Sequence, residues 1–150
     1  MSRRLALVVV VLGSALAAHV WAQPSWVQPP GKPATGFQGY WMGVDPVDGG
    51  DARRSLMQLP NGNYSLAARD TVLTLCGGTD RGFASFDDGV VVARNVMQSN
   101  TLTIQCFNNA ASVVLHVRYE LVDNGLMLEH TTTPDGSVVS TIVLHKVSQG

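Results

Sequence analysis

The sequence predicts an all-β fold, an antiparallel up-and-down meander of eight to ten strands that closes into a barrel. Three observations support this prediction. Short apolar runs rich in Val, Leu, Thr and Ser alternate with turn dipeptides, and β-branched side chains suit a pleated surface. No stretch beyond the N-terminal segment keeps a 3.6-residue periodicity over ten positions. The connections are short enough to join only antiparallel neighbours, and a meander of this size removes its open edges by closing on itself.

The first 22 residues predict a secretory signal peptide. Ser2-Arg3-Arg4 provides a positive start, Leu5 to Leu12 is an unbroken apolar run, and Val20-Trp21-Ala22 fits the small-x-small cleavage pattern. The alternative is an uncleaved anchor, but the strongly apolar stretch is shorter than the about 20 residues that span a bilayer. We therefore expect a periplasmic or secreted protein that begins at Gln23 and has no membrane span after cleavage.

The composition of the remaining chain bounds its size and its partners. Removing 22 of 150 residues leaves 128, enough for one domain with a core. The signal contains Arg3 and Arg4, so eight basic residues face eleven acidic ones and the net charge becomes −3. Because phosphate backbones are recognised chiefly by Lys and Arg, the absence of a basic cluster argues against nucleic-acid binding.

A proline-rich arm at residues 23–36 precedes the predicted barrel domain at residues 37–150. Proline cannot donate to a β-ladder and keeps the chain extended, so the arm reads as a tether. Trp26 is unusual in a linker; it either docks on the domain or forms a recognition tip, and docking is the simpler interpretation.

Ten apolar runs in the domain predict its strands in order. They are Phe37 to Val44, Arg53 to Leu59, Tyr64 to Ala68, Val72 to Cys76, Gly82 to Phe86, Val90 to Met97, Thr101 to Phe107, Ser112 to Val122, Leu126 to Thr132 and Val138 to Val147. Turn signals between them are Pro60-Asn61-Gly62, Asp88-Gly89, Ser99-Asn100, Asn124-Gly125 and Pro134-Asp135-Gly136. Asn-Gly and Asp-Gly tolerate the positive φ of tight hairpins, and Pro-Asp-Gly suits a type I turn with a glycine bulge.

The two cysteines, Cys76 and Cys106, predict one structural disulfide. An exported chain with two cysteines most simply joins them. Neither has a Cys-x-x-Cys partner for redox chemistry, and a zinc site would need four ligands at short spacings.

The turn at Asn124-Gly125 suggests a register for the hairpin around it. A two-residue loop places Leu121 opposite Leu128 and Tyr119 opposite His130 on the inner face, and Glu120 opposite Glu129 on the outer face. A shift by one residue would bring Glu120 opposite Leu128, so the alternation favours the first register.

The next turn, Pro134-Asp135-Gly136, extends this register to the last strand. His130 then lies opposite Ser140 and Leu128 opposite Ile142. The expected inner face of the last strand is Val138, Ser140, Ile142 and Leu144, while His116 and His145 are expected on the outer face.

Tyr119, His130 and Ser140 would then form a polar patch within an apolar wall, and they are the candidate ligand-binding residues. Pockets orient ligands with a few such groups, but a satisfied core network would look the same in the sequence. His130 could act as a base toward Ser140, yet no acid is placed to orient it, and Gly-x-Ser-x-Gly and His-Glu-x-x-His are absent. We therefore expect no enzyme activity and no cofactor.

Asp45, Asp48 and Asp51 lie within seven residues and could offer oxygen ligands to calcium. They lack the spacing and the closing Glu of an EF-hand loop. Asp and Gly are also common in exposed connections, so the segment predicts a solvated turn and no metal site.

Gly39-Tyr40-Trp41, at the start of the first strand and after a flexible arm, resembles the Gly-x-Trp motif of the lipocalin-like (calycin) barrels. The resemblance implies that Trp41 closes one barrel end and packs against a basic side chain of the last strand, here Lys146. The sequence departs from the family at Thr79-Asp80, which is followed by Arg81-Gly82 where lipocalins carry an aromatic residue, and it has no helix after the last strand.

These observations lead to an exported, non-enzymatic, lipocalin-like protein that holds a small apolar ligand in its barrel. The first alternative is an inhibitor or partner-binding module acting on a secreted protein such as a hydrolase, because small exported bacterial inhibitors are similar in scale and also use an N-terminal arm. It would present an exposed arm or loop that carries Trp26 or Phe83. The second alternative is a structural envelope protein.

Overall fold

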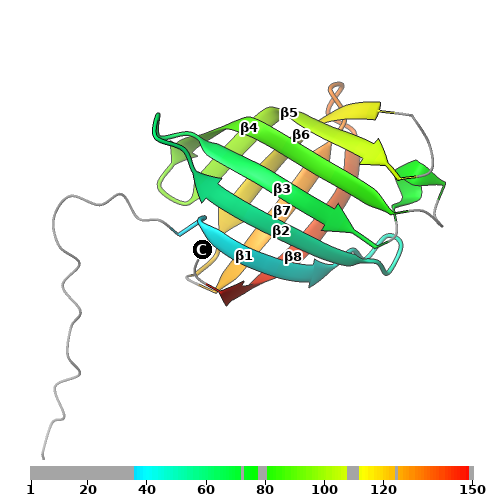
Figure 1. Ribbon diagram of the computed structural model, residues 1–150, viewed down its shortest axis with the longest axis horizontal. Helices are drawn as coiled ribbons and strands as arrows, with labels where there is room; N and C mark the ends of the chain where they lie inside the picture. The colour runs from blue at the N-terminus through cyan, green and yellow to red at the C-terminus, as the bar shows by residue number, and fades with distance from the viewer. Residues whose placement is uncertain (1–35, 72, 78–80, 108–111, 124, 149–150) are drawn as a thin grey trace, which may run out of the picture. The chain divides into compact units, whose positions relative to one another are not determined.

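The computed structural model describes residues 36–71, 73–77, 81–107, 112–123 and 125–148. These residues form eight antiparallel strands, each hydrogen-bonded to the next in the chain, and β1 also pairs with β8. The predicted closed barrel is therefore confirmed, and Figure 1 shows β2 and β3 crossing in front of β7 and β8. The strands are β1 (Gly39–Val44), β2 (Asp51–Gln58), β3 (Tyr64–Asp70), β4 (Gly82–Ala93), β5 (Val96–Cys106), β6 (Ser112–Leu121), β7 (Leu126–Thr132) and β8 (Val138–Ser148).

The signal peptide and nearly all of the proline-rich arm lie outside the described residues. So does Trp26. Of the arm, only Gly36 is described.

The alternation of side chains fills the barrel interior. Along β2, β3 and β6 every second residue points inward, and most of these positions are buried while their neighbours are half-buried or exposed. The largest fully buried side chains are Trp41, Tyr64, Tyr119, Phe37, Leu56, Met97, Leu115, Met127, Ile142 and Leu144. The two ends of the barrel are named by a feature that each carries. The Phe37 end carries Phe37 and the β2–β3, β4–β5 and β6–β7 connections. The η1 end carries the β1–β2, β3–β4, β5–β6 and β7–β8 connections and is named after a short 3-10 helix, η1 (Thr74–Cys76).

The strand predicted over Val72 to Cys76 is wrong, because Thr74–Cys76 form the short 3-10 helix η1. Val72 itself lies outside the described residues. Leu73, just before η1, packs so closely on Gly82 of β4 that a Cβ there would lie 1.8 Å from the Leu73 Cδ1 atom. Because Gly82 has no side chain, Leu73 can pack against it and cover the barrel end. The segment around Leu73 makes this contact instead of pairing as a strand.

Two of the predicted turns are wrong. Asp88-Gly89 lies within β4 and Ser99-Asn100 within β5, so three predicted strands are two long ones joined by a turn at Arg94-Asn95. Both segments coincide with irregularities in the ladder, and at the second one the Ser99 hydroxyl bonds to Asp88 Oδ1 at 2.5 Å. In β4 and β5 these turn-forming residues occupy β-bulges, which bend the long strands around the barrel.

The predicted register of the β6–β7 hairpin is also wrong, by one residue. Tyr119 lies opposite Glu129 and Glu120 opposite Leu128. Val122 and Asp123 leave the ladder, and Asp123 Oδ1 accepts a bond from the Gly125 amide at 2.7 Å, so the connection is longer than two residues. Because side chains alternate, the shift exchanges the two faces of β7.

The β7–β8 hairpin keeps its predicted turn but not its predicted pairs. Gly136 has a φ of 89°, as a glycine bulge requires, and its amide bonds to Thr133 O. The ladder shifts between Thr131 and Thr132, so Ser140 pairs with Thr131 instead of His130. Ser140, Ile142 and Leu144 are buried as predicted, whereas Val138 is exposed.

Trp41 and Lys146 close the Phe37 end as the resemblance implied. They are directly paired across β1 and β8, and the Lys146 Nζ atom lies 5.0 Å from the centre of the buried Trp41 ring. Trp41 Nε1 donates to Phe37 O at 2.9 Å, and Lys146 Nζ donates to Gly36 O at 3.2 Å. Gly39 lies in the same strand with a φ of 136°, a backbone conformation that favours glycine.

The predicted disulfide between Cys76 and Cys106 is confirmed. It ties the last residue of η1 to the last residue of β5, and therefore fixes the segment that covers one end of the barrel.

We expect that breaking this bond destabilises the protein by about 3 kcal/mol, since it closes a loop of about 30 residues. The Cys76→Ser/Cys106→Ser variant should show this loss in urea unfolding. The same loss should appear in the wild type on addition of reductant, and reductant should not change the variant. Equal stability of the wild type with and without reductant would contradict the prediction.

Candidate functional site

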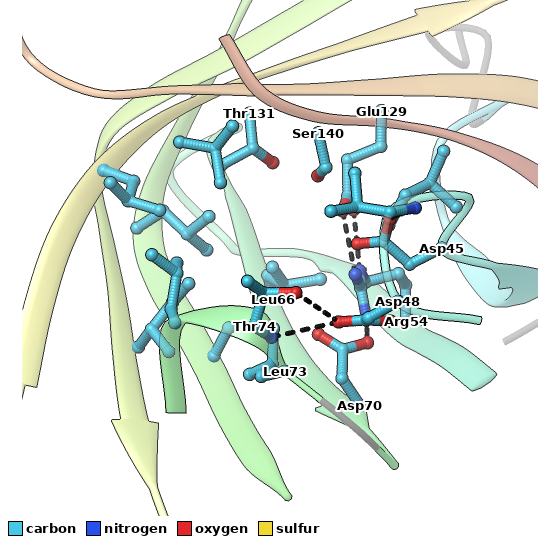
Figure 2. A pocket seen from close by; sticks show the side chains of 18 of the residues that line it. Asp45, Asp48, Arg54, Leu66, Asp70, Leu73, Thr74, Glu129, Thr131 and Ser140 are labelled. Atoms are coloured by element: carbon cyan, nitrogen blue, oxygen red, sulfur yellow. Dashed lines mark hydrogen bonds and ion pairs between the residues drawn. The ribbon is translucent and has the colours of Figure 1, made fainter. Parts of the chain in front are cut away.

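A cavity of about 40 Å³ lies inside the barrel at the η1 end and is partly open to solvent. Its inner walls are buried and mostly apolar, with Leu66, Leu102 and Leu115 among them, and its mouth is formed by the exposed residues Val47 and Leu75. Figure 2 shows the polar side chains that reach into the same space. They are Asp45, Asp48, Arg54, Asp70, Thr74, Glu129, Thr131 and Ser140.

A buried ion network borders the cavity. Arg54 of β2 donates from Nε and Nη2 to the two oxygens of Glu129 in β7, at 2.6 and 2.8 Å. Its Nη1 atom donates to Asp70 Oδ1 in β3 at 2.6 Å and to the backbone oxygen of Arg53 at 3.1 Å. One guanidinium therefore links two carboxylates across the barrel, with the bidentate geometry that arginine favours.

One positive charge does not compensate two buried carboxylates. Burial raises the pKa of Asp70 to about 6, although Arg54 opposes the shift, and the charge of Glu129 raises it further. Burial also raises the pKa of Asp45, which lies near the network, and the neighbouring Asp48 adds to this effect. The site thus carries an excess of negative charge once Asp70 ionises.

The raised pKa of Asp70 makes its contribution to stability depend on pH. The folded pKa of about 6 lies above the unfolded value of about 3.8, so this contribution is complete below pH 3.8 and is lost as the pH rises through 6. The Asp70→Asn variant lacks the titrating group. We expect its free energy of unfolding, relative to wild type, to increase by about 2 kcal/mol between pH 4 and pH 7.5. Urea unfolding at several pH values measures this difference, and a constant difference would contradict it.

The hydroxyl of Tyr119 is the other unusual polar group in the cavity wall. Tyr119 is fully buried in β6, its ring contacts that of Phe86 at a centroid distance of 6.3 Å, and its hydroxyl has no hydrogen-bond partner among the described residues. Burial raises the pKa of Tyr119 well above its ordinary value, and the negative charge of Glu129 raises it further. The group is therefore a neutral hydroxyl, and it lacks the partner that buried polar groups normally have.

We expect the Tyr119→Phe variant of the free protein to be as stable as wild type or more stable by about 1 kcal/mol. A buried hydroxyl without a partner costs desolvation and returns nothing, so its removal does not destabilise. Thermal and urea unfolding measure the change, with Tyr40→Phe on the half-buried outer face of β1 as the control. A loss of more than about 1 kcal/mol would mean that the hydroxyl is bonded in the free protein.

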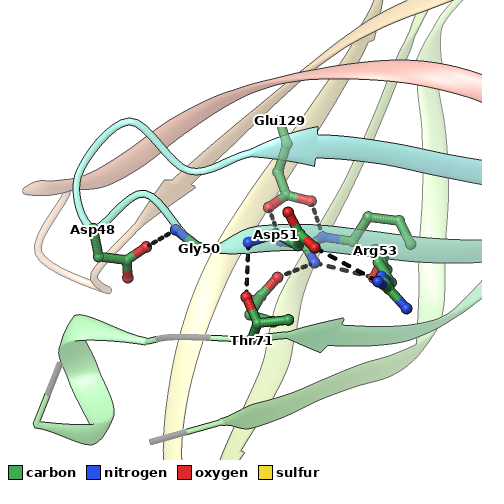
Figure 3. A network of polar contacts seen from close by, with 8 residues as sticks. Asp48, Gly50, Asp51, Arg53, Thr71 and Glu129 are labelled. Atoms are coloured by element: carbon green, nitrogen blue, oxygen red, sulfur yellow. Dashed lines mark hydrogen bonds and ion pairs between the residues drawn. The ribbon is translucent and has the colours of Figure 1, made fainter. Parts of the chain in front are cut away.

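The acidic segment at the mouth of the cavity is organised by its own backbone. Asp45 Oδ1 accepts from the Val47 amide at 2.8 Å. Asp48 Oδ1 accepts from the Gly50 amide at 2.9 Å, and Figure 3 shows this second bond. The second oxygen of Asp48 accepts from the amide and the hydroxyl of Thr74, which joins the β1–β2 connection to η1. No cluster of three or more acidic, His or Cys side chains suited to a metal occurs in the described part of the chain.

The structure separates the three predicted ligand-binding residues. Tyr119 and Ser140 both line the cavity, as expected, but His130 lies on the outer face of β7, where its Nδ1 atom is 3.1 Å from Thr141 Oγ1. His130 lines a separate open groove with His116 and Arg118. The register shift explains the difference, and it places His130 and Ser140 on opposite faces of the sheet, so they cannot act as a base and a nucleophile.

Sequence reasoning missed the charged residues that define the site. Arg54 alternates with Ala52 and Leu56, and Asp70 continues the inner face of β3, so each was a charge on an apolar face. That pattern could have indicated a buried ion pair. Glu129 was assigned to the outer face because the register placed it opposite Glu120, and only the partner on β2 explains why a carboxylate turns inward.

Comparison of the chain with protein-family models, with curated proteins and with solved structures found no match. In the residues that the structure describes, no helix has the length and apolar character needed to cross a membrane. The function is therefore inferred from the sequence, the fold and the site.

Proposed function

We propose that the chain is an exported, non-catalytic binding protein of lipocalin-like type that receives a small ligand at the η1 end of its barrel. The observation that carries this proposal is the fully buried Tyr119 hydroxyl, which lines a partly open cavity and has no partner among the described residues. A protein keeps such a group at a cost to stability, and a ligand that bonds to it explains the cost.

The size of the cavity limits the ligand. About 40 Å³ has room for roughly three water molecules, far less than the roughly 300–1,000 Å³ of a pocket that encloses a drug-sized molecule. Only a small part of the ligand enters the barrel, and the rest lies at the mouth against Val47 and Leu75. The wholly apolar ligand that the sequence suggested would leave the polar and charged groups in this mostly apolar wall without a partner, so it fits the cavity less well.

Export is part of the proposal. The charged start, apolar run and cleavage pattern of residues 1–22 support it, and the disulfide is consistent with an oxidising compartment. Mass spectrometry of the protein recovered from the periplasm or medium of an expressing bacterium should give a chain that starts at Gln23. Recovery of the full-length chain in the membrane fraction would support the anchored alternative.

A fragment screen by ligand-observed NMR tests binding at the cavity. We expect Ser140→Val to weaken the fragments that bind wild type, because the added methyl groups occupy the cavity while a β-branched residue suits the strand. Ser55→Val on the exposed face of β2 is the matched control. Fragments that bind wild type and Ser140→Val equally would show that the cavity is not the site.

The partner-binding alternative is supported by an aromatic pair on the outer surface. The rings of Phe83 and Phe107 lie 6.3 Å apart with 43% and 61% of their residue surfaces exposed, and Arg81 lies over the Phe107 ring at 5.7 Å. Aromatic residues and arginine are enriched at protein interfaces. If this pair binds a secreted protein, the Phe83→Ser/Phe107→Ser variant loses a partner from the culture medium that both wild type and Tyr119→Phe retain.

A further inference from the structure

The charges around the cavity select the chemistry of its ligand. Of the side chains that line it, four are carboxylates and one, Arg54, is basic; the carboxylates are Asp45, Asp48, Asp70 and Glu129. An anionic ligand would face this excess of like charge. A cationic ligand would reduce it.

Arg54 is not free to bind an anion. Its Nε, Nη1 and Nη2 atoms are all engaged with Glu129, Asp70 and the backbone of Arg53. A carboxylate or phosphate could bond to Arg54 only by displacing a buried carboxylate, which would leave that charge uncompensated.

Hydrogen-bond acceptors, in contrast, are available. Asp70 uses Oδ1 for Arg54, and within the described residues no donor reaches its Oδ2 atom. The buried Tyr119 oxygen, which lines the same cavity and lies near Glu129, also lacks a hydrogen-bond partner among the described residues, and this indicates an absent ligand group. Both oxygens accept hydrogen bonds, and an ammonium group supplies donors only.

We propose that the cavity binds the ammonium head of a small aliphatic amine. Its N–H groups donate to Asp70 and to the Tyr119 oxygen, and its hydrocarbon stem lies between Val47, Leu73 and Leu75 at the mouth. An ammonium group with its first methylene is small enough for the cavity. This inference rests on the proposed function and names the ligand class of the same site.

Isothermal titration of the exported chain at pH 7.5 with n-hexylamine, hexan-1-ol and hexanoate tests it, since the three probes share a stem and differ in the head. We expect hexylamine to bind about tenfold more tightly than hexanol and hexanoate to bind least, as charge-assisted hydrogen bonds are the stronger ones. Asp70→Asn and Tyr119→Phe should each weaken hexylamine by about tenfold and change hexanol little. Asp123→Asn removes one negative charge at the Phe37 end and should change neither probe.

Lowering the pH provides a second readout. Asp70 takes up a proton near pH 6, whereas an alkylamine with a pKa near that of lysine, about 10.4, stays charged. Arg54 of β2, Glu129 of β7, Tyr119 of β6 and Asp45 and Asp48 of the β1–β2 connection also face the cavity. Hexylamine affinity should fall between pH 7.5 and pH 5 in wild type and stay nearly constant in Asp70→Asn.

The outcomes separate the two proposals. Hexanol or hexanoate binding as tightly as hexylamine overturns the amine inference and leaves a binding site at the cavity. Binding of none of the three probes overturns both proposals. Hexylamine binding that Asp70→Asn and Asp123→Asn weaken equally also overturns the inference, because the attraction would then come from net charge alone.

Discussion

Replacing Arg54 by methionine should lower the free energy of unfolding at pH 7 by about 3–5 kcal/mol. Methionine retains the volume of the side chain but leaves Asp70 and Glu129 as buried charges without a cation. Both carboxylates must then be protonated or hydrated for the barrel to stay closed, and each alternative costs free energy. Urea unfolding measures the loss.

Two controls separate charge from packing. Arg53→Met changes the neighbouring, solvent-accessible arginine, whose ion pair with Asp51 at 3.5 Å is a surface contact, and it should cost less than about 0.5 kcal/mol. Adding Asp70→Asn and Glu129→Gln to Arg54→Met should recover much of the lost stability, because the uncompensated charges are gone. The loss in Arg54→Met should also shrink at pH 4.5. If the free energy of unfolding of Arg54→Met at pH 7 lies within about 1 kcal/mol of the wild-type value, Arg54 is not needed to compensate the buried charges of Asp70 and Glu129.

Replacing Trp41 by alanine should destabilise the barrel by about 3–5 kcal/mol. Trp41 is fully buried beside the pair of strands that closes the barrel, and it bonds to Phe37 O and packs beneath Lys146. Its removal leaves a large cavity at the Phe37 end and detaches the segment before β1. Thermal and urea unfolding measure the effect.

Graded variants distinguish the contributions of Trp41. Trp41→Phe should cost roughly half as much as alanine, since it keeps an aromatic ring but loses the hydrogen bond. Lys146→Met keeps the stem over the ring and removes the charge, so it should cost about 1 kcal/mol or less. If alanine at position 41 costs no more than Lys146→Met, closure of the barrel does not depend on Trp41.

The fold could be predicted from the sequence because it depends on alternation and short connections. Asn61-Gly62 and Asp135-Gly136 mark real turns, and Cys76 and Cys106 are the only cysteines available to pair. Asp88-Gly89 and Ser99-Asn100 look the same in the sequence but form bulges, since glycine and small polar residues suit both features. Only the lengths of the neighbouring strands distinguish a bulge from a turn at such residues.

The site was harder to predict from the sequence, because it depends on contacts between strands that lie far apart in the chain. The side of β7 that faces inward is decided by Glu129 meeting Arg54, 75 residues earlier in the chain. Local alternation favours the opposite side, because it treats any carboxylate as a surface residue. Tyr119 and Ser140 were placed in the interior correctly, since the inner faces of β6 and β8 are apolar around them.

The direct pairing of the first strand with the last has a consequence for biogenesis. Trp41 meets Lys146 more than a hundred residues further along the chain, so the ring of hydrogen bonds cannot be completed while the C-terminal part is still being synthesised. Until then the edges of β1 and of the newest strand are exposed to other chains. A protein built this way gains from being kept from association with other chains until its last strand is available to pair with β1.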